Sequence, residues 1–221
     1  MVLLTNADAI LPLSKELNRI AVIGPNANDR HFALGNYFGT PTIQQTVLQG
    51  IRSAVSPQTH VDYFKGTTLA DTNSIVDVLP ENVFKNGIQV QYFANAALSG
   101  NPVRTATKKW IDFEWGGAAP VEEVVPGNFS IRYTGTIVVD FTQEITLGVK
   151  ESGGAFDLRI NDQPFLSGSE GNGNGFMSNT LMLEEGKSYS FVLEYRCTNP
   201  WMASIQLLWN KEQVAGKKVM M

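Results

Sequence analysis

The spacing of hydrophobic positions changes partway along this chain. From residue 87 to about residue 209, apolar and polar residues alternate in short runs that are separated by Gly, Asn, Pro or Asp. Alternation with a period of two is typical of half-buried strands, and many short strands between turn residues are typical of stacked antiparallel sheets. The pattern predicts a mainly β fold, an antiparallel β-sandwich, with strands at 87–93, 129–133, 136–139, 145–149, 156–160, 189–195 and 203–209.

The first third of the chain has a different pattern. An apolar β-branched run at 19–23 stops at Gly24-Pro25, which predicts a buried parallel strand. Thr46 is a good N-cap for a short helix that continues to about residue 51, and 61–65 reads as a second strand. Strand, helix and strand form one βαβ unit, which cannot cover its own sheet, so we expect a partial α/β unit followed by a linker with a helical turn.

Composition narrows the function classes. The 221 residues are 43% apolar and carry a net charge of -4 with no basic run, which argues against nucleic acid and anionic membrane surfaces as partners. No stretch has the ~20 apolar residues that span a bilayer, and no signal peptide is visible at the N-terminus. Cys197 is the only cysteine, so no internal disulfide can form.

Several short motifs follow one another in the first third of the chain: Val2 to Asn6, Ile10 to Leu13, Ile20 to Ala27, Leu34 to Tyr37 and Leu48 to Ile51. Their order resembles the start of the second domain of the catalytic half of glycoside hydrolase family 3, the β-glucosidase and β-xylosidase family. The resemblance implies that residues 1–86 are part of the C-terminal α/β domain of such an enzyme.

A second set of motifs begins at Gly87: 87–93, Ile111 to Trp115, Asn128 to Gly135, Leu158 to Asn161 and Leu193 to Tyr195. These resemble the protective-antigen-type (PA-fourteen) β-sandwich, which some family 3 enzymes carry as an insert in that α/β domain. The two resemblances together imply a sandwich at 87–210 and the start of a return into the α/β domain at 211–221. We therefore expect the chain to be a fragment of a larger β-glycosidase.

The resemblance also implies where catalysis takes place. A retaining glycosidase needs two carboxylates about 5–5.5 Å apart. In the family, the nucleophilic Asp lies in a preceding barrel domain and the acid/base lies beyond the sandwich. We expect this chain to contain no catalytic residue and to require no cofactor. Its expected role is non-catalytic, the sandwich contacting glycans or shaping the active-site entrance.

Six residues are candidates for substrate binding. The glycine-rich segment 167–175 leads into an aromatic residue, which makes Asn172, Asn174 and Phe176 candidates for contact with a sugar. Trp201 follows Asn199-Pro200 in a predicted loop, where an indole ring is free to stack. Asn26 and Asp29 follow the carboxyl end of a parallel strand, which is where ligands bind in open α/β sheets.

No metal site is expected. Lectin-like members of the sandwich family hold calcium with a paired Asp-Asp motif, and the matching stretch here has Glu151-Ser152. Calcium prefers several hard oxygen ligands, and this stretch offers one carboxylate. The two histidines, His31 and His60, have no cysteine arranged with them as zinc ligands.

The expected partners are a glycan or β-linked oligosaccharide and the remainder of the parent hydrolase. The uncovered apolar residues of the partial α/β unit, at 20–23 and 61–64, also predict either a homodimer or poor order in this unit. Two alternatives stay open, a stand-alone carbohydrate-binding module and a structural or adhesion domain without sugar affinity. The family is often periplasmic or extracellular, but no export signal appears in this chain.

Overall fold

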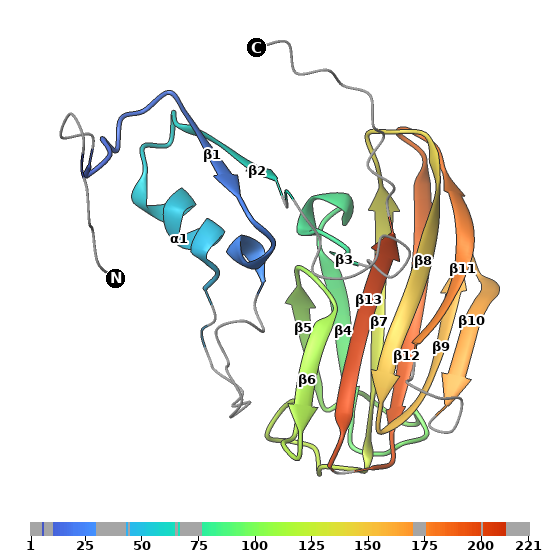
Figure 1. The fold of residues 1–221 in the computed structure, drawn as a ribbon. Helices are drawn as coiled ribbons and strands as arrows, with labels where there is room; N and C mark the ends of the chain where they lie inside the picture. Colours follow the sequence, from blue (N-terminus) through green and yellow to red (C-terminus); the bar gives the residue numbers. More distant parts are fainter. Residues whose placement is uncertain are drawn as a thin grey trace. The chain divides into compact units, whose positions relative to one another are not determined.

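The computed structural model describes residues 6, 11–29, 43, 45–64, 66, 77–169, 176–199 and 201–210. The chain divides into two compact units, Met1–Ile75 and Val76–Met221 (Figure 1). In the described part, no helix is both long enough and apolar enough to cross a membrane.

The first unit contains the predicted strand–helix–strand. Its elements are β1 (Arg19–Ile23), a 3-10 turn η2 (Pro25–Asn28), α1 (Val47–Ala54) and β2 (His60–Phe64). β1 and β2 pair in parallel, with Ile23 opposite Phe64. Thr46 caps α1 in a capping box, because its hydroxyl accepts from the Gln49 N–H at 3.2 Å and its own N–H donates to Gln49 Oε1 at 2.9 Å.

The two-stranded sheet keeps part of its apolar surface exposed. Val22 is buried, whereas Ile23 is 68% exposed and Phe64 opposite it is half exposed. Asp62 bonds to Arg19, and this hydrogen bond is the main reason why the pKa of the Asp62 carboxyl is lowered. A parallel pair is normally covered on both faces, so this unit has apolar positions that further structure can cover.

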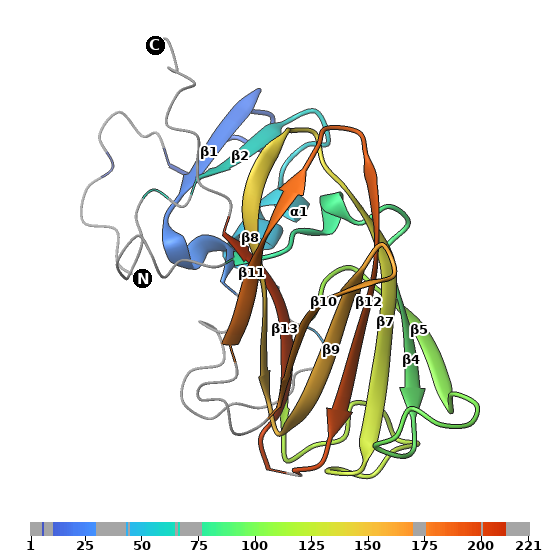
Figure 2. The same ribbon diagram turned by 90° about the vertical axis from the view of Figure 1, so that its right-hand side faces the viewer.

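The second unit is a sandwich of two antiparallel sheets, and Figure 2 shows the two layers side by side. One sheet has six strands in the order β10-β9-β12-β7-β4-β5, and the other has the order β11-β8-β13-β3, with β6 also pairing with β13. This confirms the predicted fold class. The strands are β3 (Asp77–Val78), β4 (Ile88–Phe93), β5 (Arg104–Lys108), β6 (Asp112–Gly116), β7 (Phe129–Val138), β8 (Gln143–Ser152), β9 (Gly154–Ile160), β10 (Gln163–Ser169), β11 (Phe176–Leu183), β12 (Ser188–Cys197) and β13 (Ala203–Asn210).

The core lies between the two sheets and follows the alternation in the sequence. Every second residue of the central strands is buried, for example Ile131, Tyr133, Leu193 and Tyr195. β7 is one continuous strand where the pattern predicted two, because its ladder with β12 runs unbroken from Phe129–Cys197 to Val138–Ser188.

The described sandwich includes residues that precede Gly87 in the sequence. Leu79, Val83 and Phe84 are buried in its core, and Val78 in β3 pairs with Leu208 in β13. The predicted helical turn is the 3-10 turn η5 (Glu81–Val83). These residues belong to the core because their apolar side chains close the sandwich beside Ile137, which forms a bridge with Phe84.

Candidate functional site

Phe176 is the first residue of β11 and lies on the outward face of the five-stranded sheet. The next residue, Met177, packs against the core, so alternation turns Phe176 away from it. The Phe176 ring lies against the backbone at Gly148 in β8, since a Cβ atom there would come within 2.7 Å of ring atom Cε2. The absent side chain leaves room for this ring, which is 42% exposed.

Polar residues continue across the sheet from this aromatic ring. Phe176 pairs with Lys150, Lys150 with Gln206, and Gln206 with Asp112. The Gln206 amide donates to Asp112 Oδ1 at 2.7 Å. We call Phe176, Lys150, Gln206 and Asp112 the Phe176 row. An aromatic ring beside amide, ammonium and carboxylate groups is suited to stacking on a sugar ring and bonding its hydroxyls.

Trp201 lies in the connection between β12 and β13 and is 79% exposed. Its backbone N–H donates to Asn199 Oδ1 at 3.0 Å. The backbone N–H groups of Thr198 and Asn199 both donate to the Gly153 carbonyl. The loop is therefore tied to the β8–β9 turn while the indole side chain extends into solvent. The row that holds Phe176 crosses β13 at Gln206, the fourth of the eight residues of that strand and five positions after Trp201.

The other four candidates are placed differently. Asn172 and Asn174 lie outside the described residues. Asn26 and Asp29 belong to the first unit, where Asn26 is part of the η2 turn that follows β1 and its carbonyl accepts from the Asp29 N–H at 3.4 Å. Phe176 is thus the only member of the predicted group 172–176 whose surroundings are described.

Glu151, the one carboxylate of the stretch that matches the calcium-binding motif, faces the core. It is 3% exposed and continues the inward series of Leu147 and Val149 on β8. Tyr195 lies nearby and donates its hydroxyl to the Ser152 carbonyl at 2.6 Å, and burial, with smaller contributions from Cys197 and Glu151, raises the tyrosine pKa far above its ordinary value. No group of three His, Cys, Asp or Glu side chains in the described residues could hold a metal ion.

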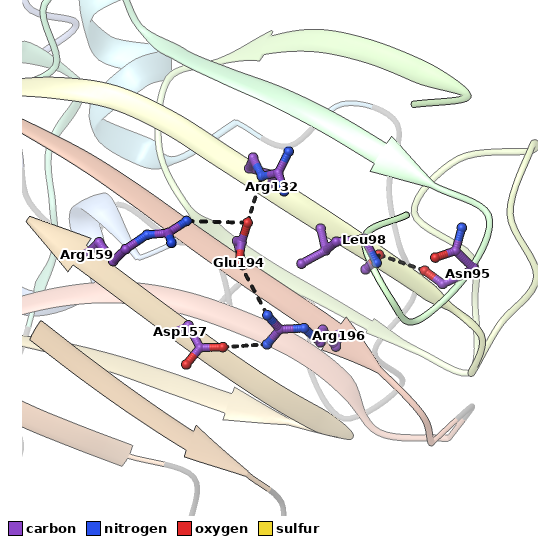
Figure 3. A network of polar contacts seen from close by, with 8 residues as sticks. Asn95, Leu98, Arg132, Asp157, Arg159, Glu194 and Arg196 are labelled. Carbon is purple, nitrogen blue, oxygen red and sulfur yellow. Dashed lines mark hydrogen bonds and ion pairs between the residues drawn. The ribbon is translucent and has the colours of Figure 1, made fainter. Parts of the chain in front are cut away.

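The sequence reasoning missed a charged cluster on the outward face of the six-stranded sheet (Figure 3). Glu194 in β12 lies opposite Arg132 in β7 and Asp157 in β9. Its carboxylate accepts from Arg132 Nε at 2.7 Å and lies 3.6 Å from Arg159 and 3.3 Å from Arg196. Arg196 also donates to Asp157. We call these five residues the Arg–Glu network. The sequence pattern that could have revealed this network is a charged residue at every second position of a strand, as in Asp157-Leu158-Arg159.

A hollow of about 380 Å³ lies beside this network. We call it the β10 hollow, and its lining consists of Asp157, Arg159, Glu194 and Arg196 together with residues 164–167 of β10. The ladder between β10 and β9 shifts register between Pro164 and Leu166, so β10 carries a bulge at this place. Bulges on edge strands redirect side chains and are frequent beside binding sites.

Residues 1–187 match the model of the glycosyl hydrolase family 3 C-terminal domain. A xylan 1,4-beta-xylosidase from Xylanibacter ruminicola is 28% identical over 94% of this chain and 24% of its own length. An anti-sigma-I factor from Acetivibrio thermocellus is 30% identical over 58% of this chain and 20% of its own length. The crystal structure of a beta-glucosidase from Kluyveromyces marxianus has a TM-score of 0.64 and 20% identity, covering 95% of this chain and 27% of that one. The chain spans about a quarter of the xylosidase.

Proposed function

Because this chain belongs to the glycosyl hydrolase family 3 C-terminal domain family, we propose that it forms a non-catalytic portion of a β-glycosidase. In this proposal the sandwich contacts glycan chains or shapes the entrance to the active site. The observation that carries it is the exposure of two aromatic side chains on the sandwich, Phe176 on the outward face of β11 and Trp201 in the loop before β13.

The two aromatics are exposed although aromatic side chains bury well. Each presents a large apolar surface to water, and each is held by backbone that the sheet or a hydrogen-bonded loop keeps in place. The Phe176 ring, which lies against Gly148, can stack on a sugar without first being ordered, which lowers the entropic cost of binding. Asn172 and Asn174 lie in the segment that leads directly to Phe176, and we assign them hydrogen bonds to sugar hydroxyls.

In the first unit, Asn26 and Asp29 are proposed to face substrate in the assembled hydrolase. They follow the carboxyl end of β1, which is the edge of a parallel sheet where ligands bind. Their contribution depends on the rest of the α/β domain, so we expect it to appear only in the longer enzyme.

A glycan array and two chromogenic substrates test this proposal. We expect the chain to bind β-linked oligosaccharides but to hydrolyse neither nitrophenyl β-glucoside nor nitrophenyl β-xyloside. Phe176→Ala and Trp201→Ala should each weaken binding about tenfold, which corresponds to the ~1.4 kcal/mol that an aromatic contact can contribute. Met182→Ala is the matched control, because Met182 is half exposed on the same outward face of β11 but far along the strand from Phe176.

Turnover of either substrate that a substitution within this chain abolishes would contradict the non-catalytic role. A blank array would contradict sugar contact and favour a structural or adhesion domain. Equal losses in all three variants would mean that the effect is not specific to Phe176 and Trp201.

The exposed apolar positions of the first unit lead to a proposal about partners. We propose that the remainder of the parent hydrolase covers Ile23 and Phe64, and that a second copy does so when the chain is alone. Light scattering should then show a dimer whose share rises with concentration. The double variant Ile23→Ser, Phe64→Ser should be monomeric, and a wild-type chain that stays monomeric at high concentration would contradict the dimer.

A second candidate function is a stand-alone carbohydrate-binding module. The match to the anti-sigma-I factor favours it, because the matched stretch is longer than the first unit and so extends into the sandwich. A sequence similar to at least part of the sandwich therefore occurs in a protein that is not named as a glycosidase. Sugar binding by residues 76–221 that equals binding by the whole chain would favour this module over a part of a hydrolase.

A further inference from the structure

We propose that the β10 hollow binds the carboxylate of an acidic sugar, a uronic acid residue carried by a glycan. The hollow opens on the six-stranded sheet, whereas the Phe176 row lies on the other sheet. This second site is thus independent of the Phe176 and Trp201 contacts, and either can fail without the other.

The charges beside the hollow do not balance. The Arg–Glu network brings three guanidinium groups together with two carboxylates, which leaves one positive charge in excess. Glu194 is only 9% exposed at its side chain, so it is committed to its arginine partners and shielded from solvent. A ligand carboxylate would supply the missing negative charge at the solvent side of the network.

Arg159 is the residue that would receive this carboxylate. Its side chain is 45% exposed, and its one ion pair with the described residues, to Glu194, is 3.6 Å long and so exceeds hydrogen-bond distance. By contrast, both terminal nitrogens of Arg196 are engaged, one by Asp157 and one by Glu194. The planar guanidinium of Arg159 therefore has donors to offer, and its fork matches the two oxygens of a carboxylate.

The shape and lining of the hollow favour a sugar over a bare anion. About 380 Å³ lies within the roughly 300–1,000 Å³ typical of small-molecule sites, so there is room for a sugar ring as well as its carboxylate. The bulged edge strand contributes residues 164–167 to the lining, and among them Pro164 pairs with Arg159 and so lies on the same face as the arginines, whereas Phe165 and Leu166 also pack against the core. A pyranose ring has apolar C–H faces, and a uronic acid adds a carboxylate to such a ring.

Calorimetric titration of the 221-residue chain tests the site with two probes. One probe is a xylo-oligosaccharide that carries a single glucuronate branch, and the other is the same backbone without the branch. We expect the branched probe to bind more tightly and to weaken when salt is raised from about 50 to about 500 mM. Arg159→Gln should lower the affinity of the chain for the branched probe about tenfold, as expected for the loss of a charge-assisted hydrogen bond.

Asp157→Asn should raise the affinity for the branched probe, a result that misfolding could not produce. Removing this negative charge beside the hollow should tighten binding of the branched probe by about threefold, because a carboxylate is repelled by the native aspartate. Lys187→Gln is the matched control. It removes a positive charge that is paired with Glu184 and lies outside both the Arg–Glu network and the Phe176 row, so it should leave the preference for the branched probe unchanged.

Three results would overturn the inference: equal affinity for the two probes, an unchanged affinity in Arg159→Gln, or weaker binding in Asp157→Asn. Displacement of the branched probe by a glutamate-rich peptide of equal potency would also overturn it, because the site would then recognise acidic peptides. If only Phe176→Ala loses binding to the unbranched probe, that loss concerns the site on the other sheet. A measured preference for the branched probe would then still support binding at the β10 hollow.

Discussion

Gly154→Ala is expected to destabilise the sandwich by at least about 4 kcal/mol, enough to prevent folding at moderate temperature. A Cβ atom at this first residue of β9 would lie 1.9 Å from the Arg196 carbonyl oxygen and 2.9 Å from its carbonyl carbon. Both are backbone atoms of β12, the strand to which Gly154 is paired through Cys197. The backbone of two central strands would have to separate, because no flexible side chain can move aside.

Gly186→Ala is the matched control for this substitution. Gly186 lies in a turn with φ of +72°, but nothing lies within 4 Å of a Cβ atom placed there. Its cost comes only from the left-handed backbone and should be about 1 kcal/mol. Urea unfolding followed by circular dichroism measures both. A Gly154→Ala variant that unfolds within about 1 kcal/mol of wild type would show that β9 and β12 are not paired as closely as described.

Glu194→Ala is expected to lower the free energy of unfolding by about 3 kcal/mol. The carboxylate of Glu194 is nearly buried and lies within 4 Å of Arg132, Arg159 and Arg196. Removing it leaves three guanidinium groups close together with only Asp157 to compensate. Because the arginines are partly exposed and solvent screens them, we place the loss at the lower end of the range for breaking a buried pair.

Two further variants separate charge from packing at this position. Glu194→Ala combined with Arg132→Met should recover part of the loss, since it removes one of the repelling charges. Glu144→Ala, at an exposed glutamate on the other sheet, should change stability by less than about 0.5 kcal/mol. Added salt should stabilise Glu194→Ala more than wild type. Equal stability of Glu194→Ala and Glu144→Ala would contradict a structural role for the network.

The central strands could be predicted from the sequence and the edge strands could not. β7, β9, β12 and β13 each bury one face against the opposite sheet, so their sequences alternate. The edge strands β10 and β11 are covered less completely, and along β11 Phe176 and Met182 are exposed together with polar residues. The glycine-rich segment before Phe176 was recognised, but the strand that follows it lacks the alternation that marks a buried face.

The Arg–Glu network could not be predicted because it depends on strand register. Arg132, Asp157 and Glu194 come from three strands, and no local pattern tells which of their residues lie opposite one another. The location of Phe176 over Gly148 likewise depends on the pairing of β11 with β8. In contrast, Trp201 was expected in an exposed loop from Asn199-Pro200 alone, and it is exposed there.

The central claim is that the sandwich contacts glycan through Phe176 and Trp201. NMR titration of the isotopically labelled chain with a β-1,4-linked xylo-oligosaccharide tests it most directly. We expect saturable shifts at the Trp201 indole N–H and at the amides of Phe176, Lys150 and Gln206, and the shifts at Lys150 and Gln206 should disappear in the Phe176→Ala, Trp201→Ala double variant. No shift at these groups, or shifts that persist unchanged in the double variant, would contradict it.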